Sequence, residues 1–203
     1  MADAELPRVM LGVTASPVVR AEFAHRLAAN ISNLEGTVSV TTVFAVDRDI
    51  NAARHQLMDM AAEEDFLQIV MLDDSVDPHP FALGRIMSGE HHVVGMNYLV
   101  PVMGGVSWSA RQGVKPVATQ SNWEMTEKVD SFGLLFFRVS LDKKFREWYG
   151  KSRHMFHALD QKPEDTFASM VRDSGRELYI DHGLSNVCGV AAYQSLYPKH
   201  AEA

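Results

Sequence analysis

The feature that most constrains the fold is an alternation of short apolar segments with amphipathic segments in the first half of the chain. Residues 9–13 form an apolar run that ends at Thr14. Apolar side chains then recur every three or four residues, which is the spacing of one helix face. These side chains are Val19, Phe23, Leu27, Ile31 and Leu34. Residues 37–46, 66–72 and 92–98 are strand-like, and helical patterns separate them. This order predicts an α/β protein with a mostly parallel sheet flanked by helices.

The second half of the chain is less regular. Residues 100–128 are rich in Gly, Pro and Ser and show no sustained period, which predicts a long loop with one short strand. Residues 133–139 predict a strand and residues 141–149 a helix. Pro163 starts another predicted helix, because proline is favoured in the first helical turn. A short strand over 177–180 and an irregular tail complete the prediction.

Composition and charge narrow the class of protein. Cys188 is the single cysteine, which excludes a disulfide framework and a cysteine-based zinc site and is consistent with a reducing compartment. No segment approaches the roughly 18 consecutive apolar residues of a membrane span, and the start MADAELP lacks the apolar stretch of a secretory signal. We therefore expect a cytoplasmic protein with a single domain over residues 1–203, a core over about 8–190 and a tail over 191–203.

Two acids at the end of a predicted strand are the sharpest candidate for chemistry. Asp73 and Asp74 directly follow the mainly apolar run 66–72. Ligands of open parallel sheets bind beyond the carboxyl ends of the strands. Carboxylate oxygens suit Mg²⁺ or Mn²⁺, and such an ion can bridge to a diphosphate. The alternative is that these acids only end the strand or cap a turn.

A second group of polar residues lies near the C-terminus. Glu164 and Asp165 open a predicted helix. One interpretation is that these acids stabilise the helix by interacting with the positive end of its dipole. The other is that one of them points into a pocket and accepts a proton from an attacking hydroxyl. His182 follows the last predicted strand and is a candidate metal ligand, phosphate donor or ordinary surface histidine.

The order of these segments resembles that of the GT-A glycosyltransferases, especially their compact phage and bacterial members. The resemblance runs from about Arg8 to about Val190. The segments that carry it are VMLGVTASP, INAARHQLMDMA, FLQIVMLDDSVDPHP, HHVVGMNY, FGLLFFRVS, the pair Trp148-Tyr149, Glu164-Asp165-Thr166-Phe167 and YIDHGLSNVCGV. The resemblance implies a GT-A-like (Rossmann-like) α/β fold.

The resemblance also implies an activity, which is transfer of a sugar from a nucleotide diphosphate sugar to an acceptor hydroxyl. Mn²⁺ or Mg²⁺ would offset the charge on the leaving diphosphate. The residues implied at the nucleotide sugar are Thr14, Asp47, Arg54, Asp73, Asp74 and Gly133. Gly133 would allow the backbone to approach the donor or the acceptor closely. Asp165 is the implied catalytic base of an inverting enzyme, with Glu164 beside it.

Two positions depart from the family pattern. Ser75 stands where the second acid of the acidic motif is expected, and Val190 stands where the family has a metal-binding histidine. A valine side chain cannot ligate a metal. The metal site is therefore shifted, or the donor binds without tight metal coordination, or catalysis is lost. The ligands predicted for a shifted site are Asp73, Asp74 and His182, with Asp77 as a further carboxylate.

Three functional hypotheses follow. The first is a glycosyltransferase that acts on a glycan, a protein or a modified nucleic-acid base. The second is a catalytically decayed nucleotide-sugar-binding or scaffolding protein. The third is a nucleotidyltransferase, although VTASP lacks the glycine-rich phosphate loop that would support it. The predicted partner is a nucleotide diphosphate sugar, and the acceptor stays open. A DNA acceptor is not favoured by the net charge of −7, despite a basic stretch over 143–153.

Overall fold

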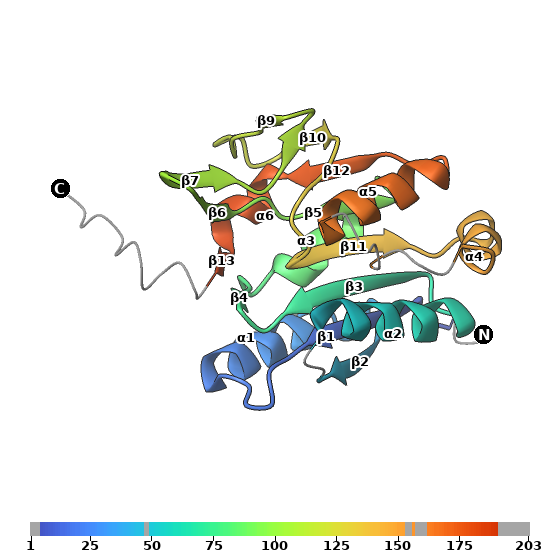
Figure 1. Ribbon diagram of the computed structural model, residues 1–203. Coiled ribbons are helices and arrows are strands. Elements are labelled where there is room, and N and C mark those ends of the chain that lie inside the picture. Colours follow the sequence, from blue (N-terminus) through green and yellow to red (C-terminus); the bar gives the residue numbers. More distant parts are fainter. Residues whose placement is uncertain (1–4, 47–48, 153–155, 157–161, 191–203) are drawn as a thin grey trace.

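A central sheet of seven strands organises the computed structural model, which describes residues 5–46, 49–152, 156 and 162–190 (Figure 1). The strand order is β10-β12-β5-β11-β3-β1-β2. The strands are β1 (Arg8–Thr14), β2 (Ser39–Ala45), β3 (Gln68–Asp73), β5 (Val93–Gly95), β10 (Thr126–Val129), β11 (Phe136–Ser140) and β12 (Leu178–Asp181). Five strands run in one direction, and β10 and β11 run against them. The predicted mostly parallel α/β sheet is confirmed.

Helices cover both faces of the sheet. The helices of one face are α1 (Ala21–Ser32), α3 (Ala82–Ser88) and α6 (His182–Val187), and those of the other are α2 (Ile50–Glu63), α4 (Lys143–Tyr149) and α5 (Pro163–Asp173). The buried apolar residues of each set form a separate cluster with one face of the sheet. Within the described ranges, no helix has both the length and the apolar character needed to cross a membrane.

Strand β3 shows why the pattern of the sequence selects this architecture. Ile69 and Met71 point into the cluster under α2, whereas Val70 and Leu72 point into the cluster under α1 and α3. Successive side chains of a strand face opposite sides of the sheet. A strand covered by helices on both sides must therefore be apolar at nearly every position, and this is the composition of residues 69–72.

The order of the first three strands creates the point at which a ligand site is expected. The chain passes from β1 through α1 to β2, and returns through α2 to β3 on the far side of β1. The carboxyl ends of β1 and β3 are therefore neighbours, with Thr14 directly beside Asp73 in the register. Ligands of open α/β sheets bind where the strand order reverses in this way.

The prediction of a long loop with one short strand over 100–128 was wrong. This part of the chain forms two hairpins and then enters β10. The hairpins pair β6 (Leu99–Val102) with β7 (Gly105–Trp108), and β8 (Arg111–Gln112) with β9 (Lys115–Pro116). Gly104 and Gly113 make the turns with φ of 92° and 59°, a region that favours glycine. Strands of two to four residues are too short to show a period of two in the sequence.

The irregular tail predicted after residue 180 was also wrong. Helix α6 starts there, and the Asp181 carboxylate accepts a hydrogen bond from Leu184 N. Strand β13 (Gly189–Val190) then pairs with β4 (Val76–Asp77). A helix of six residues offers too few turns for a periodic signal. Residues 191–203, predicted to be a tail, lie outside the described residues, and the predicted limits of the domain stay a prediction.

A crossing segment connects β10 to β11 over the face of the sheet that α5 covers. Phe132 lies against β5 so closely that a Cβ on Gly95 would be 2.5 Å from the ring. Glycine is therefore required at this position of β5 for the segment to cross. The crossing brings Ser131 and Gly133 to the start of α5, where they line a common hollow with Asp165.

Candidate active site

The carboxyl ends of β1 and β3 are joined through Asp73. This residue is 8% exposed. Its Oδ2 accepts a hydrogen bond of 3.0 Å from Thr14 Oγ1. Its Oδ1 accepts from Ser75 N at 3.0 Å and from Ser75 Oγ at 2.5 Å. Both carboxylate oxygens are occupied, so the orientation of Asp73 is fixed. The structure thus joins Thr14 and Asp73, two of the residues implied at the nucleotide sugar, and their role at a nucleotide stays a prediction.

Asp74 turns away from Asp73 and closes the loop after β1. Its backbone N–H donates to Thr14 O at 3.0 Å. Its Oδ2 accepts from Ser16 N at 2.8 Å and from Ser16 Oγ at 2.7 Å. Within the part of the chain that the structure describes, Oδ1 accepts no hydrogen bond. Asp74 therefore presents one carboxylate oxygen that can bind a ligand.

A hollow of about 190 Å³ opens at these two acids. It lies at the ends of β1, β2 and β3 and at the first turn of α2. Its polar walls are Thr14, Ser16, Asp73 and Asp74, and its apolar walls are Ala15, Ala45, Ile50 and Ala53. The described lining residues thus include two carboxylates and no cationic side chain. Asp47, predicted beside the nucleotide, lies outside the described residues.

Arg54 is a buried cation on α2. It is 5% exposed, and its Nη2 donates to Leu134 O at 2.9 Å. Burial lowers the pKa of Arg54, and the nearby negative charges of Asp73 and Glu164 oppose this effect. No hydrogen bond joins Arg54 to Asp73 directly. The charge of Arg54 therefore acts on Asp73 without a direct ion pair, and its predicted role at the nucleotide sugar stays a prediction.

A second hollow, of about 220 Å³, contains the predicted catalytic acids. Glu164 and Asp165 enter it from the first turn of α5. Glu164 is half-buried and Asp165 is exposed. Gly133 lies against Tyr98 in the same hollow, where an added Cβ would be 2.1 Å from Tyr98 Oη. The missing side chain of Gly133 is thus needed to accommodate Tyr98.

His182 does not join the acidic motif. It is fully buried at the start of α6. Its Nδ1 accepts from Gln120 N at 3.1 Å, and its Nε2 lies 3.1 Å from Glu127 Oε2. An accepting Nδ1 leaves the proton on Nε2, so neither nitrogen offers a lone pair to a metal. The alternative of a surface histidine was wrong as well, because long-range packing covers the side chain.

The predicted three-ligand metal site is not formed. Among the residues the structure describes, no group of three or more His, Cys, Asp or Glu side chains is arranged to hold a metal ion. Asp77, the further carboxylate, is 4% exposed and lies 2.9 Å from Arg20 Nη1. Val190 pairs with Val76, next to the acidic motif, but its side chain packs into the apolar core. The position resembling the family's histidine is thus near the acids without contributing a ligand.

Sequence reasoning missed two residues of the site. Tyr98 forms a wall of the second hollow. Arg20 donates from Nη2 to Asp74 O at 2.8 Å and lies beside Asp77. The available signals were an aromatic residue at the end of a predicted strand and a cation in the first turn of a predicted helix. Neither signal is specific, because the partners of both side chains are distant in sequence.

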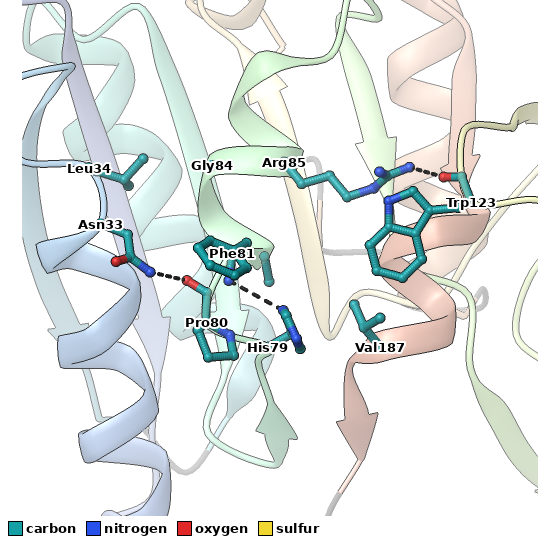
Figure 2. A pocket seen from close by; sticks show the side chains of 10 residues that line it. Asn33, Leu34, His79, Pro80, Phe81, Gly84, Arg85, Trp123 and Val187 are labelled. Atoms are coloured by element: carbon teal, nitrogen blue, oxygen red, sulfur yellow. Dashed lines mark hydrogen bonds between the residues drawn. The ribbon is translucent and has the colours of Figure 1, made fainter.

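An apolar hollow of about 300 Å³ lies elsewhere, between α1, α3 and α6 (Figure 2). Phe81 and Trp123 line it and are exposed. Figure 2 shows the Arg85 guanidinium beside the Trp123 ring. The same guanidinium donates hydrogen bonds to the Trp123 carbonyl and to the Asp181 carboxylate. None of the acids predicted for chemistry lines this hollow.

Comparison with known proteins supports the fold. No family model and no curated protein matches the chain. The crystal structure of A197 from STIV is similar, with a TM-score of 0.56, 19% identity, and coverage of 85% of this chain and 81% of that one. A mutant Drosophila β-1,4-galactosyltransferase 7 in complex with manganese, UDP-Gal and xylobiose is similar with a TM-score of 0.50, 13% identity, and coverage of 98% and 76%. The predicted GT-A-like fold is confirmed at the level of architecture.

Proposed function

We propose that this protein is a glycosyltransferase that moves a sugar from a nucleotide diphosphate sugar to an acceptor hydroxyl. The observation that carries the proposal is the position of Arg54, a buried cation that connects the two hollows. Its neighbour Ala53 lines the first hollow, and its Nη2 donates to the carbonyl of Leu134, which follows Gly133 of the second. The negative charges of Asp73 and Glu164, one from each hollow, both act on this guanidinium. The similarity to a galactosyltransferase fold supports the same class of activity.

The first hollow takes the nucleotide diphosphate in this proposal. Its apolar walls suit a base and a ribose, and Asp73 and Asp74 lie at its polar end. Two carboxylates without a cation in the described lining would repel a diphosphate. Mg²⁺ and Mn²⁺ are commonly held by one or two carboxylates together with substrate phosphates, and Asp74 Oδ1 fits that mode. A divalent cation bound there would offset the charge of the leaving diphosphate.

Asp165 acts as the base in the second hollow. It is exposed, and no hydrogen bond from the described residues occupies its carboxylate. The acceptor oxygen forms a bond to the anomeric carbon while the bond from that carbon to the phosphate oxygen breaks. The nucleoside diphosphate leaves with the bonding electron pair, and the acceptor proton passes to Asp165. Glu164, half-buried beside it, orients the reacting groups.

A nucleotide-sugar-binding protein without transfer activity is the second candidate. The observation that favours it is Val190, which stands where the resembled family has a metal-binding histidine. Its strand β13 pairs with β4, directly after the acidic motif, and its side chain is buried. Ser75 likewise offers no carboxylate, and it instead donates two hydrogen bonds to Asp73. Both candidates share the donor site, so turnover rather than binding separates them.

The experiment is a thermal-shift titration with UDP-, GDP-, dTDP- and CMP-sugars, each with and without Mn²⁺. A ligand that binds only the folded state raises the melting temperature. We expect one nucleotide class to raise it, with a larger rise in Mn²⁺, and the Asp74→Asn variant to lose the increment due to Mn²⁺. Hydrolysis or transfer of the bound donor then identifies the enzyme, and binding without any turnover identifies the second candidate. No rise with any nucleotide sugar would overturn the proposal.

A further inference from the structure

The hollow that contains Asp165 continues into a larger one. The larger hollow has a volume of about 580 Å³. Ser131, Lys162 and Asp165 line both hollows. Because the two share these walls, they form one groove, and Asp165 stands between its halves. We call the half beyond Asp165, at Ala168, Ser169 and Arg172, the distal half.

One wall of the distal half is a single face of α5. Its members are Asp165, Ala168, Ser169 and Arg172. These positions are spaced by three and four residues, so they lie on one side of a helix. The opposite side carries Phe167 and Val171, which are buried in the core. The packing of that apolar side fixes the rotation of α5 and thereby presents the polar face to the groove.

The facing wall is held in place by its own hydrogen bonds. Gly113, at the turn of the second hairpin, donates from its backbone N–H to Asp130 Oδ2 at 2.5 Å. Arg172 Nη1 donates to Asp130 O at 2.6 Å and connects this wall to α5. A site whose walls are fixed before binding loses less conformational entropy when a ligand enters. The distal half is therefore organised without a ligand.

The charges of the distal half balance. Its lining contains two carboxylates, Asp130 and Asp165, and two cations, Lys162 and Arg172. A polyanion such as a nucleic acid needs an excess of cations, which these residues do not provide. A neutral ligand with hydroxyl groups suits the lining, because each hydroxyl both donates and accepts hydrogen bonds. Val100, Pro101 and Val102 give the other half an apolar wall for C–H surfaces.

We propose that the groove binds a neutral saccharide acceptor of at least two units. The unit with the reactive hydroxyl lies between Tyr98 and Asp165, and the next unit lies against Ser169 and Arg172. The term acceptor rests on the proposed function, whereas the saccharide class and the two-unit length rest on the groove itself. The proposal excludes a DNA acceptor. It also implies that residues of α5 select the length of the saccharide chain.

The test is saturation-transfer NMR on the full chain. The neutral probes are methyl glycosides of glucose, galactose, xylose, mannose and N-acetylglucosamine, with their di- and trisaccharides. A heparin-derived tetrasaccharide and a short single-stranded DNA are the anionic probes. We expect at least one neutral disaccharide to receive saturation on both units and to bind about tenfold more tightly than its monosaccharide.

The variant Ser169→Trp fills the distal half without touching the other half. It should reduce disaccharide affinity to that of the monosaccharide and leave the monosaccharide unchanged. Ser32→Trp, on the exposed last residue of α1, is the matched control and should change neither affinity. Arg172→Gln is a second variant that should weaken only the disaccharide, and a far-UV spectrum checks the fold of each protein.

Three results would overturn the inference: no neutral saccharide binds, an anionic probe binds more tightly, or Ser169→Trp leaves the disaccharide preference intact. Nucleotide-sugar binding is measured separately at the other hollow. Donor binding without saccharide binding rejects this inference alone. Saccharide binding without donor binding rejects the proposed glycosyltransferase and leaves a saccharide-binding groove.

Discussion

The Thr14 hydroxyl donates to Asp73 Oδ2 over 3.0 Å and joins residues that are 59 positions apart in the sequence. The two side chains end β1 and β3 at the reversal of the strand order. Ser75 donates to the other oxygen of the same carboxylate. The hydrogen bonds from Thr14 and Ser75 together fix the orientation of the Asp73 side chain. The acidic end of the proposed donor site is thus oriented by a neutral hydroxyl.

Removing that hydroxyl should disturb the donor site. Thr14→Val keeps the shape of the side chain but leaves Asp73 Oδ2 without its donor, at a cost of about 1–3 kcal/mol in the free energy of unfolding. We expect a lower melting temperature and about tenfold weaker nucleotide-sugar binding by calorimetry. Thr14→Ser restores the hydroxyl and should behave as the parent protein. Equal binding by the valine and serine variants would contradict the role of this hydrogen bond.

Asp165 should affect turnover without affecting donor binding. Asp165→Asn removes the proton acceptor in the proposed mechanism, so transfer should fall by about 10²–10⁴-fold. The nucleotide-sugar dissociation constant should not change, since Asp165 does not line the donor hollow. Asp173→Asn, at the exposed end of the same helix, is the control. Full activity of Asp165→Asn would reject Asp165 as the base.

Gly133 should tolerate no side chain while Tyr98 is present. An added Cβ would lie 2.1 Å from Tyr98 Oη and 2.3 Å from Tyr98 Cζ. We expect Gly133→Ala to lower stability by about 1–3 kcal/mol, as overpacking does, when measured by urea unfolding. Combination with Tyr98→Val should recover most of that loss, because the ring is then absent.

A second glycine provides the matched control for that substitution. A Cβ on Gly84, in α3, would meet only Leu34 Cδ2 at 3.6 Å, which is an ordinary contact. Gly84→Ala should therefore be neutral or stabilising, since alanine is favoured over glycine in a helix. If Gly133→Ala proves as mild as Gly84→Ala, the contact with Tyr98 is not a constraint.

Loss of the buried cation Arg54 should destabilise the protein more than loss of an exposed cation does. Replacement by Met removes a buried cation and leaves Asp73 and Glu164 without its compensation. The expected loss in the free energy of unfolding is about 3–5 kcal/mol. Arg26→Met, which breaks only the exposed pair with Glu22, should cost less than about 0.5 kcal/mol. A comparable loss for both variants in urea unfolding would contradict the buried role.

Cys188, which is half-buried in the structure, should react slowly with thiol reagents because its thiol ionises weakly. Burial raises the pKa of its thiol from 9.0 to about 12. At pH 8 the thiolate fraction is then lower by roughly a thousandfold than for an ordinary thiol, and labelling slows accordingly. The folded state holds the Cys188 proton more tightly than the unfolded state does. The contribution of this thiol to the free energy of unfolding is therefore fully present below pH 9 and is lost as the pH rises towards 12.

Labelling with a chromogenic disulfide at pH 8 tests this expectation. The native protein should react slowly, and the same protein in urea should react at the rate of a free thiol. Fast labelling of the native protein would show that Cys188 is accessible and ionises normally.

The first part of the central sheet followed from local sequence because its strands and helices are long enough to carry a signal. Residues 8–73 hold β1, β2 and β3 with α1 and α2 between them. Continuous apolar runs mark β1 and β3, and apolar side chains spaced by three or four residues mark the helices. The two-residue strands β8 and β9 and the six-residue helix α6 carry no comparable signal. The turn glycines of the hairpins were visible in the sequence, but their φ values depend on the pairing of the flanking strands.

By itself, the sequence determined that apolar segments alternate in a way that builds a parallel sheet, and that Asp73, Asp74 and Asp165 follow or open its elements. This is local information, since periodicity states which faces are buried. Only the tertiary structure decided that His182 is enclosed by Gln120 and Glu127 rather than beside Asp73. It alone also brought Tyr98, Gly133 and Asp165 into one groove. Those neighbours come from distant segments, and which distant segments meet depends on packing that no local pattern encodes.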